Sequence, residues 1–445
     1  MQVPAELWSL TATEVSRLIK KDRLTVEDYA KALMNPDLVL SQARVLDQIS
    51  HDQRGQLHGV AIAIKDIMDT KDRTPGGSSA GSAAAVADFQ VPLSFGTQTG
   101  GSVIRPASYK GTYAMKPTFN TIAGGGIMVA SPELDTIGYF AHCMEDLKRI
   151  TDVLSLPTEI STKEIPLEEA RVGFVKSPFW SSAGPGTVAA LKKAADILRK
   201  HGVTVEDVEF PDKFDDAAAL RRMFKVIFVT DSGASFYSDY LIDTTKTKLD
   251  PDVRAFVEDA PKFSREEVRE VFDYYGPLRP VLNKIAARYS ALITPSATDE
   301  APLELGDMGS PIFNSVWTVR NPWALQKCHR LTYFVLGARM PVINVLAFAG
   351  PNGMPVGLPA RNTNMASQRV PGLFHSTPLR RRAHQGLRCL NAHRKASTFN
   401  GMTELSEDVD PSSSMHIGGP SEEHIKSFDP IARTKRRERQ LPPSR

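Results

Sequence analysis

Cysteine is scarce in this chain of 445 residues, which holds three, at Cys143, Cys328 and Cys389. Because they are far apart and odd in number, the sequence excludes a disulfide framework and offers no zinc-ligand spacing. Long apolar runs are missing too, since no stretch approaches the roughly 20 residues of a membrane-spanning helix. The N-terminal residues lack the basic and apolar regions of a secretion signal. We therefore expect a soluble, cytoplasmic protein that does not bind membranes.

Acidic and basic residues nearly balance, and the formal net charge is +3. Residues 361–445, however, contain 15 basic and 8 acidic residues. After Leu358 the apolar periodicity fades into the Ser-, Pro- and Arg-rich composition of disordered sequence. We expect one folded domain over residues 1–358 and a basic, disordered tail over residues 359–445. Few aromatic residues accompany the arginines of the tail, so the sequence does not favour nucleic-acid binding.

Helical and strand patterns alternate along the expected domain. Residues 8–33 have the apolar spacing of amphipathic helices, residues 59–65 read as a buried strand, and a helix opens near Ser79. Other patterns predict strands at 91–95, 171–176, 291–296 and 341–345, and helical segments at 187–202 and 213–290. This alternation predicts an α/β fold.

Two glycine-rich turns that each carry a serine are the strongest functional signal. The first reads Thr-Pro-Gly-Gly-Ser-Ser-Ala-Gly over residues 74–81 and contains Ser78. The second reads Gly-Thr-Gln-Thr-Gly-Gly-Ser over residues 96–102 and ends at Ser102. Glycine permits turns that other residues avoid and lets consecutive N–H groups point to one place. A nucleophile and its oxyanion hole need that arrangement.

Ser102 is the candidate nucleophile because a Thr-Gly-Gly turn precedes it directly. In that position the backbone N–H groups of Thr99, Gly100 and Gly101 would face a carbonyl group held over the serine oxygen. These three residues are therefore the candidate oxyanion and substrate-binding groups.

The two turns resemble those of the amidase signature family of serine hydrolases, and the Gly-Thr-Gln-Thr-Gly-Gly-Ser variant resembles its fungal-type amidases. Three other segments are similar to segments of the family. Residues 110–118 resemble its Gly-Leu-Lys-Pro-Thr stretch, residues 131–141 its Asp-Thr-x-Gly-x-x-Ala stretch and residues 349–358 its Gly-Leu-Pro-Val-Gly stretch. The resemblance covers about residues 8–358 and is densest from 59 to 142.

The resemblance implies an amidase-signature α/β/α core, with a mixed central sheet flanked by helices. It also implies a Ser-Ser-Lys triad in which Ser102 attacks, Ser78 relays protons from a position on a cis peptide bond, and Lys65 is the general base. A lysine base must be neutral, so burial has to lower its pKa from roughly 10.4. The implied reaction is hydrolysis of a linear, non-peptide carboxylic amide through an acyl-enzyme, with no metal or organic cofactor.

The sequence departs from the family in three places. Ser78 lies only 13 residues after Lys65, where the family has a segment several times longer, so we expect weaker packing around the lysine. Residues 319–340 read as an insertion, and the residues after Leu358 do not continue the family's closing strand and helices. An altered gene model would account for all three.

Three functions remain open at this point. Amide hydrolysis implies a small-molecule amide as the partner and a monomer or homodimer as the assembly. A catalytically impaired or inactive amidase-like protein is the second alternative, and the short Lys65–Ser78 connection favours it. The third is the glutaminase component of a glutamyl-tRNA amidotransferase, which requires partner subunits.

Overall fold

The computed structural model describes residues 7–33, 37–65, 76–156, 166–246, 248–303, 307–315, 317 and 341–361. The chain divides into two compact units, residues 1–388 and residues 389–445, and every described residue belongs to the first. The insertion expected at residues 319–340 and residues 362–445 of the expected tail lie outside the described residues.

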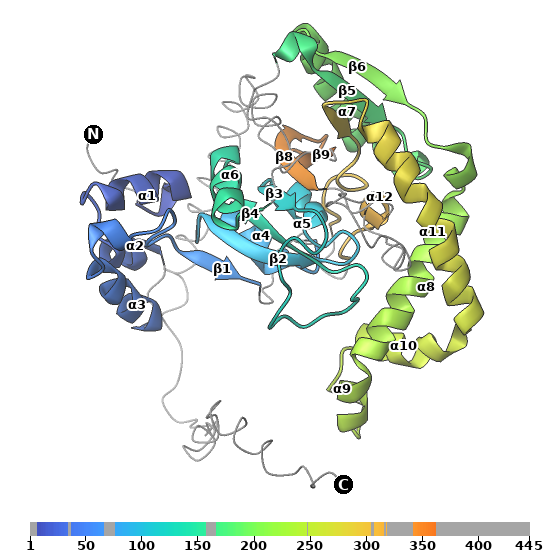
Figure 1. Cartoon of the computed structure of the whole chain (residues 1–445), viewed down its shortest axis with the longest axis horizontal. Helices are drawn as coiled ribbons and strands as arrows, with labels where there is room; N and C mark the ends of the chain where they lie inside the picture. The colour runs from blue at the N-terminus through green and yellow to red at the C-terminus, as the bar shows by residue number, and fades with distance from the viewer. Residues whose placement is uncertain are drawn as a thin grey trace, which may run out of the picture. The chain divides into compact units, whose positions relative to one another are not determined.

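A mixed β-sheet forms the centre of the first unit (Figure 1). Within the described residues it has nine strands in the order β1-β2-β4-β3-β8-β9-β7-β5-β6. Their bounds are β1 Ile62–Ile64, β2 Leu93–Gln98, β3 Tyr113–Lys116, β4 Thr136–Ala141, β5 Arg171–Val175, β6 Thr204–Val208, β7 Ala291–Ile293, β8 Val342–Ala349 and β9 Pro355–Arg361. The β1–β2, β5–β6 and β5–β7 pairs are parallel, and the other pairs are antiparallel. The predicted α/β class with a mixed sheet is confirmed.

Helices flank this sheet and also form an extension beside it (Figure 1). The helices are α1 Ala12–Lys20, α2 Val26–Leu33, α3 Asp37–Asp47, α4 Ala80–Ala87, α5 Ile104–Lys110, α6 Met144–Val153, α7 Pro185–Lys200, α8 Ala217–Ser235, α9 Tyr237–Ile242, α10 Pro251–Asp259, α11 Arg265–Ala286 and α12 Ile312–Ser315. Among the residues that the structure describes, no helix combines the length and apolar composition needed to cross a membrane.

The alternation of side chains along β4 shows how helices cover both faces of the sheet. Successive strand residues point to opposite faces. Tyr139 packs in one core cluster with Leu147 and Ile150 of α6, whereas Phe140 packs in another with residues of α4 and α5. The two serine turns lead into α4 and α5, so the candidate site lies where these helices begin.

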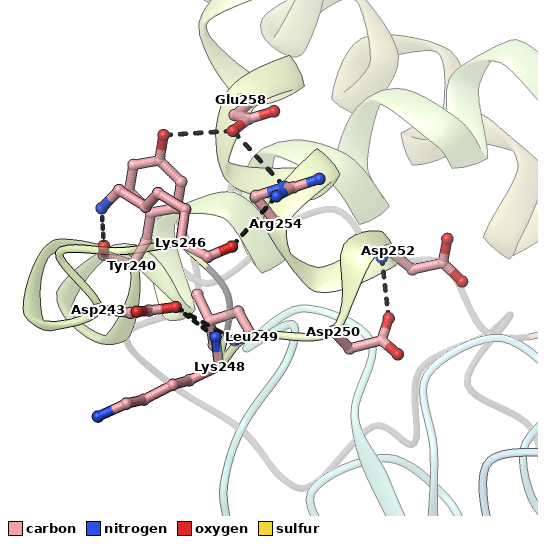
Figure 2. A network of polar contacts seen from close by, with 9 residues as sticks. All are labelled: Tyr240, Asp243, Lys246, Lys248, Leu249, Asp250, Asp252, Arg254 and Glu258. Atoms are coloured by element: carbon pink, nitrogen blue, oxygen red, sulfur yellow. Dashed lines mark hydrogen bonds and ion pairs between the residues drawn. The ribbon is translucent and has the colours of Figure 1, made fainter.

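The α9–α10 region is held by polar contacts of its own, which Figure 2 shows from close by. The Asp243 carboxylate after α9 accepts hydrogen bonds from the backbone N–H groups of Lys248 (2.8 Å) and Leu249 (3.3 Å), and these bonds lower its pKa although burial opposes them. Arg254 of α10 donates to the Lys246 carbonyl oxygen at 3.1 Å. These bonds fix the connection from α9 to α10 without help from the sheet.

The β8–β9 hairpin joins the two halves of the sheet, because β8 pairs with β3 and β9 pairs with β7. β9 continues through Arg361, which lies opposite both Leu292 and Val342. The domain expected to end at Leu358 therefore extends at least to Arg361. The sequence analysis placed this boundary too early, because a proline and an arginine are atypical of a strand interior. Pro359 and Arg361 nevertheless belong to β9, which is paired on both sides.

Two truncations test this boundary. We expect a chain ending at Thr363 to melt at the temperature of the full chain, because it keeps every described pairing of β9. A chain ending at Leu358 loses the pairings of β9 with β7 and should melt several degrees lower, since about 1 kcal/mol shifts the melting temperature by a few degrees. Calorimetry would measure both. Equal melting temperatures would show that residues 359–361 contribute nothing to the fold.

Candidate active site

Lys65 lies directly after β1 and points at the first serine turn. The parallel β1–β2 register places Ile64 opposite Phe95, so Lys65 continues alongside the end of β2. Its Nζ donates one hydrogen bond to Ser78 Oγ and one to Thr97 Oγ1, each at 2.8 Å. Both acceptors are neutral hydroxyl groups, so neither stabilises the charged ammonium as a carboxylate would.

Burial lowers the pKa of Lys65 to about 8, and the negative charge of Asp135 opposes this shift. A neutral amine, the form that can accept a proton, is therefore well populated in mildly alkaline solution. The shorter connection was expected to weaken the packing around this lysine. The neighbouring Ile64 is indeed 79% exposed. The Lys65 side chain is nevertheless desolvated, because it extends toward Thr97 of β2 and Ser78 of the serine turn.

Ser78 lies in a turn whose backbone is fixed by an arginine. The Gly77–Ser78 peptide bond is cis, as the family resemblance implies, and Gly76 has a φ of +71°, which glycine adopts readily. The buried Arg105 of α5 donates from Nη2 to the Gly77 carbonyl oxygen at 2.7 Å. The turn before α4 is thus tied to the helix that follows the second turn.

Ser102 lies in the second turn, which Gln98 anchors. Gln98 is fully buried, and its Oε1 accepts hydrogen bonds from the N–H groups of Val103 and Ile104 at the start of α5, both at 3.0 Å. The Ser79 N–H donates to the Ser102 carbonyl oxygen at 3.3 Å, which holds the two turns side by side. Within the described residues no hydrogen bond joins the Ser78 and Ser102 hydroxyl groups.

Each of the three candidate oxyanion residues has a close side-chain neighbour from another part of the chain. Thr99 Oγ1 donates to Asp135 Oδ1 at 2.5 Å, which fixes the position of the Thr99 side chain. A Cβ atom on Gly100 would lie 3.2 Å from the ring of Phe224, and one on Gly101 would lie 3.1 Å from Pro311. Only glycine leaves this space free at both positions.

Three apolar side chains that the sequence analysis did not single out border the two turns. Phe224 comes from α8, and Met308 and Pro311 come from the segment before α12. Met308 lies against Gly77, where a Cβ would collide with its sulfur, and is 49% exposed. These residues carry no sequence motif, and only the fold places them near the serines.

Carboxylates also gather beside the second turn. Asp135 Oδ2 accepts a hydrogen bond from the Ala130 N–H at 2.7 Å, and Ser131 Oγ donates to Asp231 Oδ2 of α8 at 2.5 Å. Burial raises the pKa of Asp231. Asp135 belongs to the segment that resembles the family, which is the one signal that could have identified it. Among the described residues there is no group of three His, Cys, Asp or Glu side chains that could hold a metal ion.

Comparison with known proteins identifies the family. The model of the amidase family matches residues 70–363, which is more than half of the chain, so the protein belongs to the amidase family. Among its relatives, a glutamyl-tRNA(Gln) amidotransferase subunit from Thermus thermophilus is 35% identical over 166 residues, 35% of each chain. The corresponding protein from Treponema denticola is 28% identical over 338 residues, 67% of this chain and 66% of the relative. The chain thus spans about a third of the first of these relatives and about two thirds of the second.

Solved structures share the fold. A structure described as an amidase has a TM-score of 0.67 at 18% identity and covers 82% of this chain and 99% of its own. Fatty acid amide hydrolase has a TM-score of 0.64 at 16% identity, with 83% and 86% covered. The peptide amidase of Stenotrophomonas maltophilia has a TM-score of 0.61 at 18% identity, with 80% and 94% covered. At these identities the likeness shows a common fold.

The role of Gln98 as an anchor predicts a stability effect. Replacing Gln98 with Leu keeps the volume nearly constant but removes the acceptor of the Val103 and Ile104 N–H groups. We expect a loss of about 2 kcal/mol in the free energy of unfolding, because two buried donors lose their partner. Urea unfolding would measure it, with the exposed Gln48→Leu as the matched control. Equal stability of both variants would contradict the anchoring role.

The environment of Lys65 predicts its titration. Isotope-labelled reductive methylation and NMR should give a pKa of about 8 for Lys65, with the signal assigned by its loss in Lys65→Arg. Asp135→Asn should lower this pKa further, because the negative charge that raises it is removed. The exposed Asp207→Asn, on β6, is the control and should leave the pKa unchanged. A pKa near 10.5 would contradict the desolvation of the lysine.

Proposed function

We propose that this protein hydrolyses carboxylic amides through an acyl-enzyme on Ser102, with Ser78 and Lys65 as the proton relay. The observation that carries the proposal is the 2.8 Å hydrogen bond from Lys65 Nζ to Ser78 Oγ, made by a lysine whose pKa is lowered to about 8. A structural lysine is usually charged and solvated. A desolvated lysine bonded to a serine, beside a second serine in a Gly-Gly turn, has the arrangement of an activated nucleophile.

The reaction proceeds in two halves. In the first, Ser102 Oγ attacks the amide carbon, its proton passes through Ser78 to Lys65, and the developing oxyanion accepts hydrogen bonds from backbone N–H groups of the Thr99–Gly101 turn. The carbon–nitrogen bond then breaks, and the relay returns the proton to the leaving amine. In the second half, water attacks the ester, the acid leaves, and Ser102 regains its proton.

The second link of the relay must form with substrate present. The Ser78 and Ser102 hydroxyl groups share no hydrogen bond in the described part of the chain, although the two turns are held together by the Ser79–Ser102 backbone bond. Catalytic hydrogen bonds are commonly long in the free enzyme and tighten in the substrate complex. We infer that substrate bound over the second turn brings the two hydroxyl groups together.

The border of the site favours substrates with an apolar acyl group. Phe224 and Pro311 lie against the turn that would hold the amide oxygen, and the exposed side of Met308 lies beside the Ser78 turn. A carbonyl carbon over Ser102 would place its substituent among these side chains, where burial of apolar surface contributes about 25 cal/mol per Å². A linear aliphatic or aromatic amide is the substrate class that this border fits best.

The test combines labelling with turnover. A fluorophosphonate probe should label the native protein but not Ser102→Ala, and hydrolysis of butyramide or benzamide should fall by at least about a thousandfold in that variant. The exposed Ser181→Ala is the matched control and should behave as the native protein. The labelling rate should rise with pH through about 8, because Lys65 acts as a base only when neutral. Unchanged labelling of Ser102→Ala would reject the nucleophile.

The relatives supply a second candidate function. Both are named for the glutamyl-tRNA(Gln) amidotransferase, a name that favours glutamine as the amide and partner subunits as a requirement. Glutamine hydrolysed in strong preference to benzamide would support it. A folded protein that the probe does not label would support the third possibility, an amidase-like protein without activity.

A further inference from the structure

A pocket apart from the serine turns collects positive charge. It has a volume of about 290 Å³ and lies between α1, the segment after the short helix His51–Gln53, and α6. Its charged and titratable lining residues are Arg17, Lys20, His51, Arg54, His58 and Arg149, and no carboxylate lines it. Such a grouping is unexpected on a domain whose residues 1–360 are more acidic than basic.

The charge of this pocket is largely unbalanced. Asp22, which is not among its lining residues, forms an ion pair with Arg54 at 3.0 Å and lies 3.4 Å from His51 Nε2. Arg17, Lys20 and Arg149 form no ion pair with any residue in the described part of the chain. Four lining side chains are therefore cationic at neutral pH, and among the described residues only Arg54 is paired with a carboxylate. Their mutual repulsion lowers stability unless an anion binds.

Several donors in the pocket have a fixed position. Arg149 donates to Thr13 Oγ1 and to the Gln56 carbonyl oxygen, both at 3.3 Å, and Arg54 donates to the Ile49 carbonyl oxygen at 3.0 Å. These bonds hold the two guanidinium groups in place. Fixed guanidinium groups are suited to phosphate because their planar donors match its oxygens.

Gly55, Gln56 and His58 line the same pocket. His58 Nε2 is buried and has no hydrogen-bond partner, and burial together with the charge of Arg54 lowers the pKa of this histidine. Within the described residues, the backbone N–H groups of Gly55 and Gln56 donate no hydrogen bond. Besides the four cations, the lining thus includes an imidazole and two residues whose backbone N–H groups have no hydrogen-bond partner among the described residues.

We propose that this pocket binds the phosphate group of a small phosphorylated molecule, a phosphate monoester or a diphosphate. The volume is near the lower end of the roughly 300–1,000 Å³ of small-molecule sites, which suits a compact anion. A ligand with two or more negative charges matches four cationic side chains better than a ligand with one carboxylate does. The site is independent of the amidase chemistry, so its test does not depend on turnover.

Calorimetric titration of the full chain with pyrophosphate tests the proposal. We expect Arg17→Gln/Lys20→Gln to weaken binding at least about tenfold, since each removes a charge-assisted contact. Both side chains are exposed and form no hydrogen bond with a described residue, so folding should persist. Lys192→Gln/Lys200→Gln is the matched control, because it removes the same number of positive charges from exposed positions of α7. Lys200 lies in the last turn of its helix, as Arg17 and Lys20 do in α1. Arg149→Gln should weaken binding as well.

Further arms distinguish the source of the phosphate. Binding to phosphatidylcholine vesicles only when they contain phosphatidic acid, lost in the Arg17/Lys20 variant, would identify a lipid headgroup. Binding of pyrophosphate alone would identify a soluble ligand. Equal weakening in the control pair, or no heat of binding and no vesicle binding, would overturn the proposal. So would an RNA oligonucleotide that binds more tightly than pyrophosphate with a steep salt dependence, because that marks an extended nucleic-acid surface.

Discussion

The parallel pairing of β1 with β2 is the contact on which the candidate site depends. Because Ile64 lies opposite Phe95, Lys65 leaves its strand next to Thr97 and reaches Ser78 at 2.8 Å. The same placement removes water from the ammonium group and lowers its pKa to about 8. A strand of three described residues thus sets both the position and the charge state of the lysine.

Three polar side chains, one inside the second serine motif and two beyond it, hold the two turns in place. Gln98 caps the start of α5, Arg105 returns from α5 to the Gly77 carbonyl oxygen, and Asp135 fixes Thr99. Each of these three side chains is buried or half-buried and forms hydrogen bonds with backbone or side-chain groups of the turns. Loss of such a partner leaves a buried group unsatisfied, which costs more than the bond itself contributes. These hydrogen bonds therefore hold the glycine-rich turns in one backbone conformation.

The sequence predicted what is local. The serine turns, the strand before Lys65 and most of the helices follow from residue patterns within about ten positions, and the mixed α/β class follows from their order. Strands β3, β4, β6 and β9 were not predicted, because short strands depend on partners far along the chain. The positions of Phe224 and Met308 were missed for the same reason, since only the folded chain brings them to Gly100 and Gly77.

The place of β8 and β9 in the chain affects how the protein is synthesised. The ribosome releases β1–β4 first and β5–β7 later, and in the described residues no strand of one group pairs with a strand of the other. Until the hairpin emerges, β3 and β7 each present an unpaired edge, which favours wrong association between chains. A nascent chain that stalls before residue 342 therefore has two open sheet edges and no means of closing either.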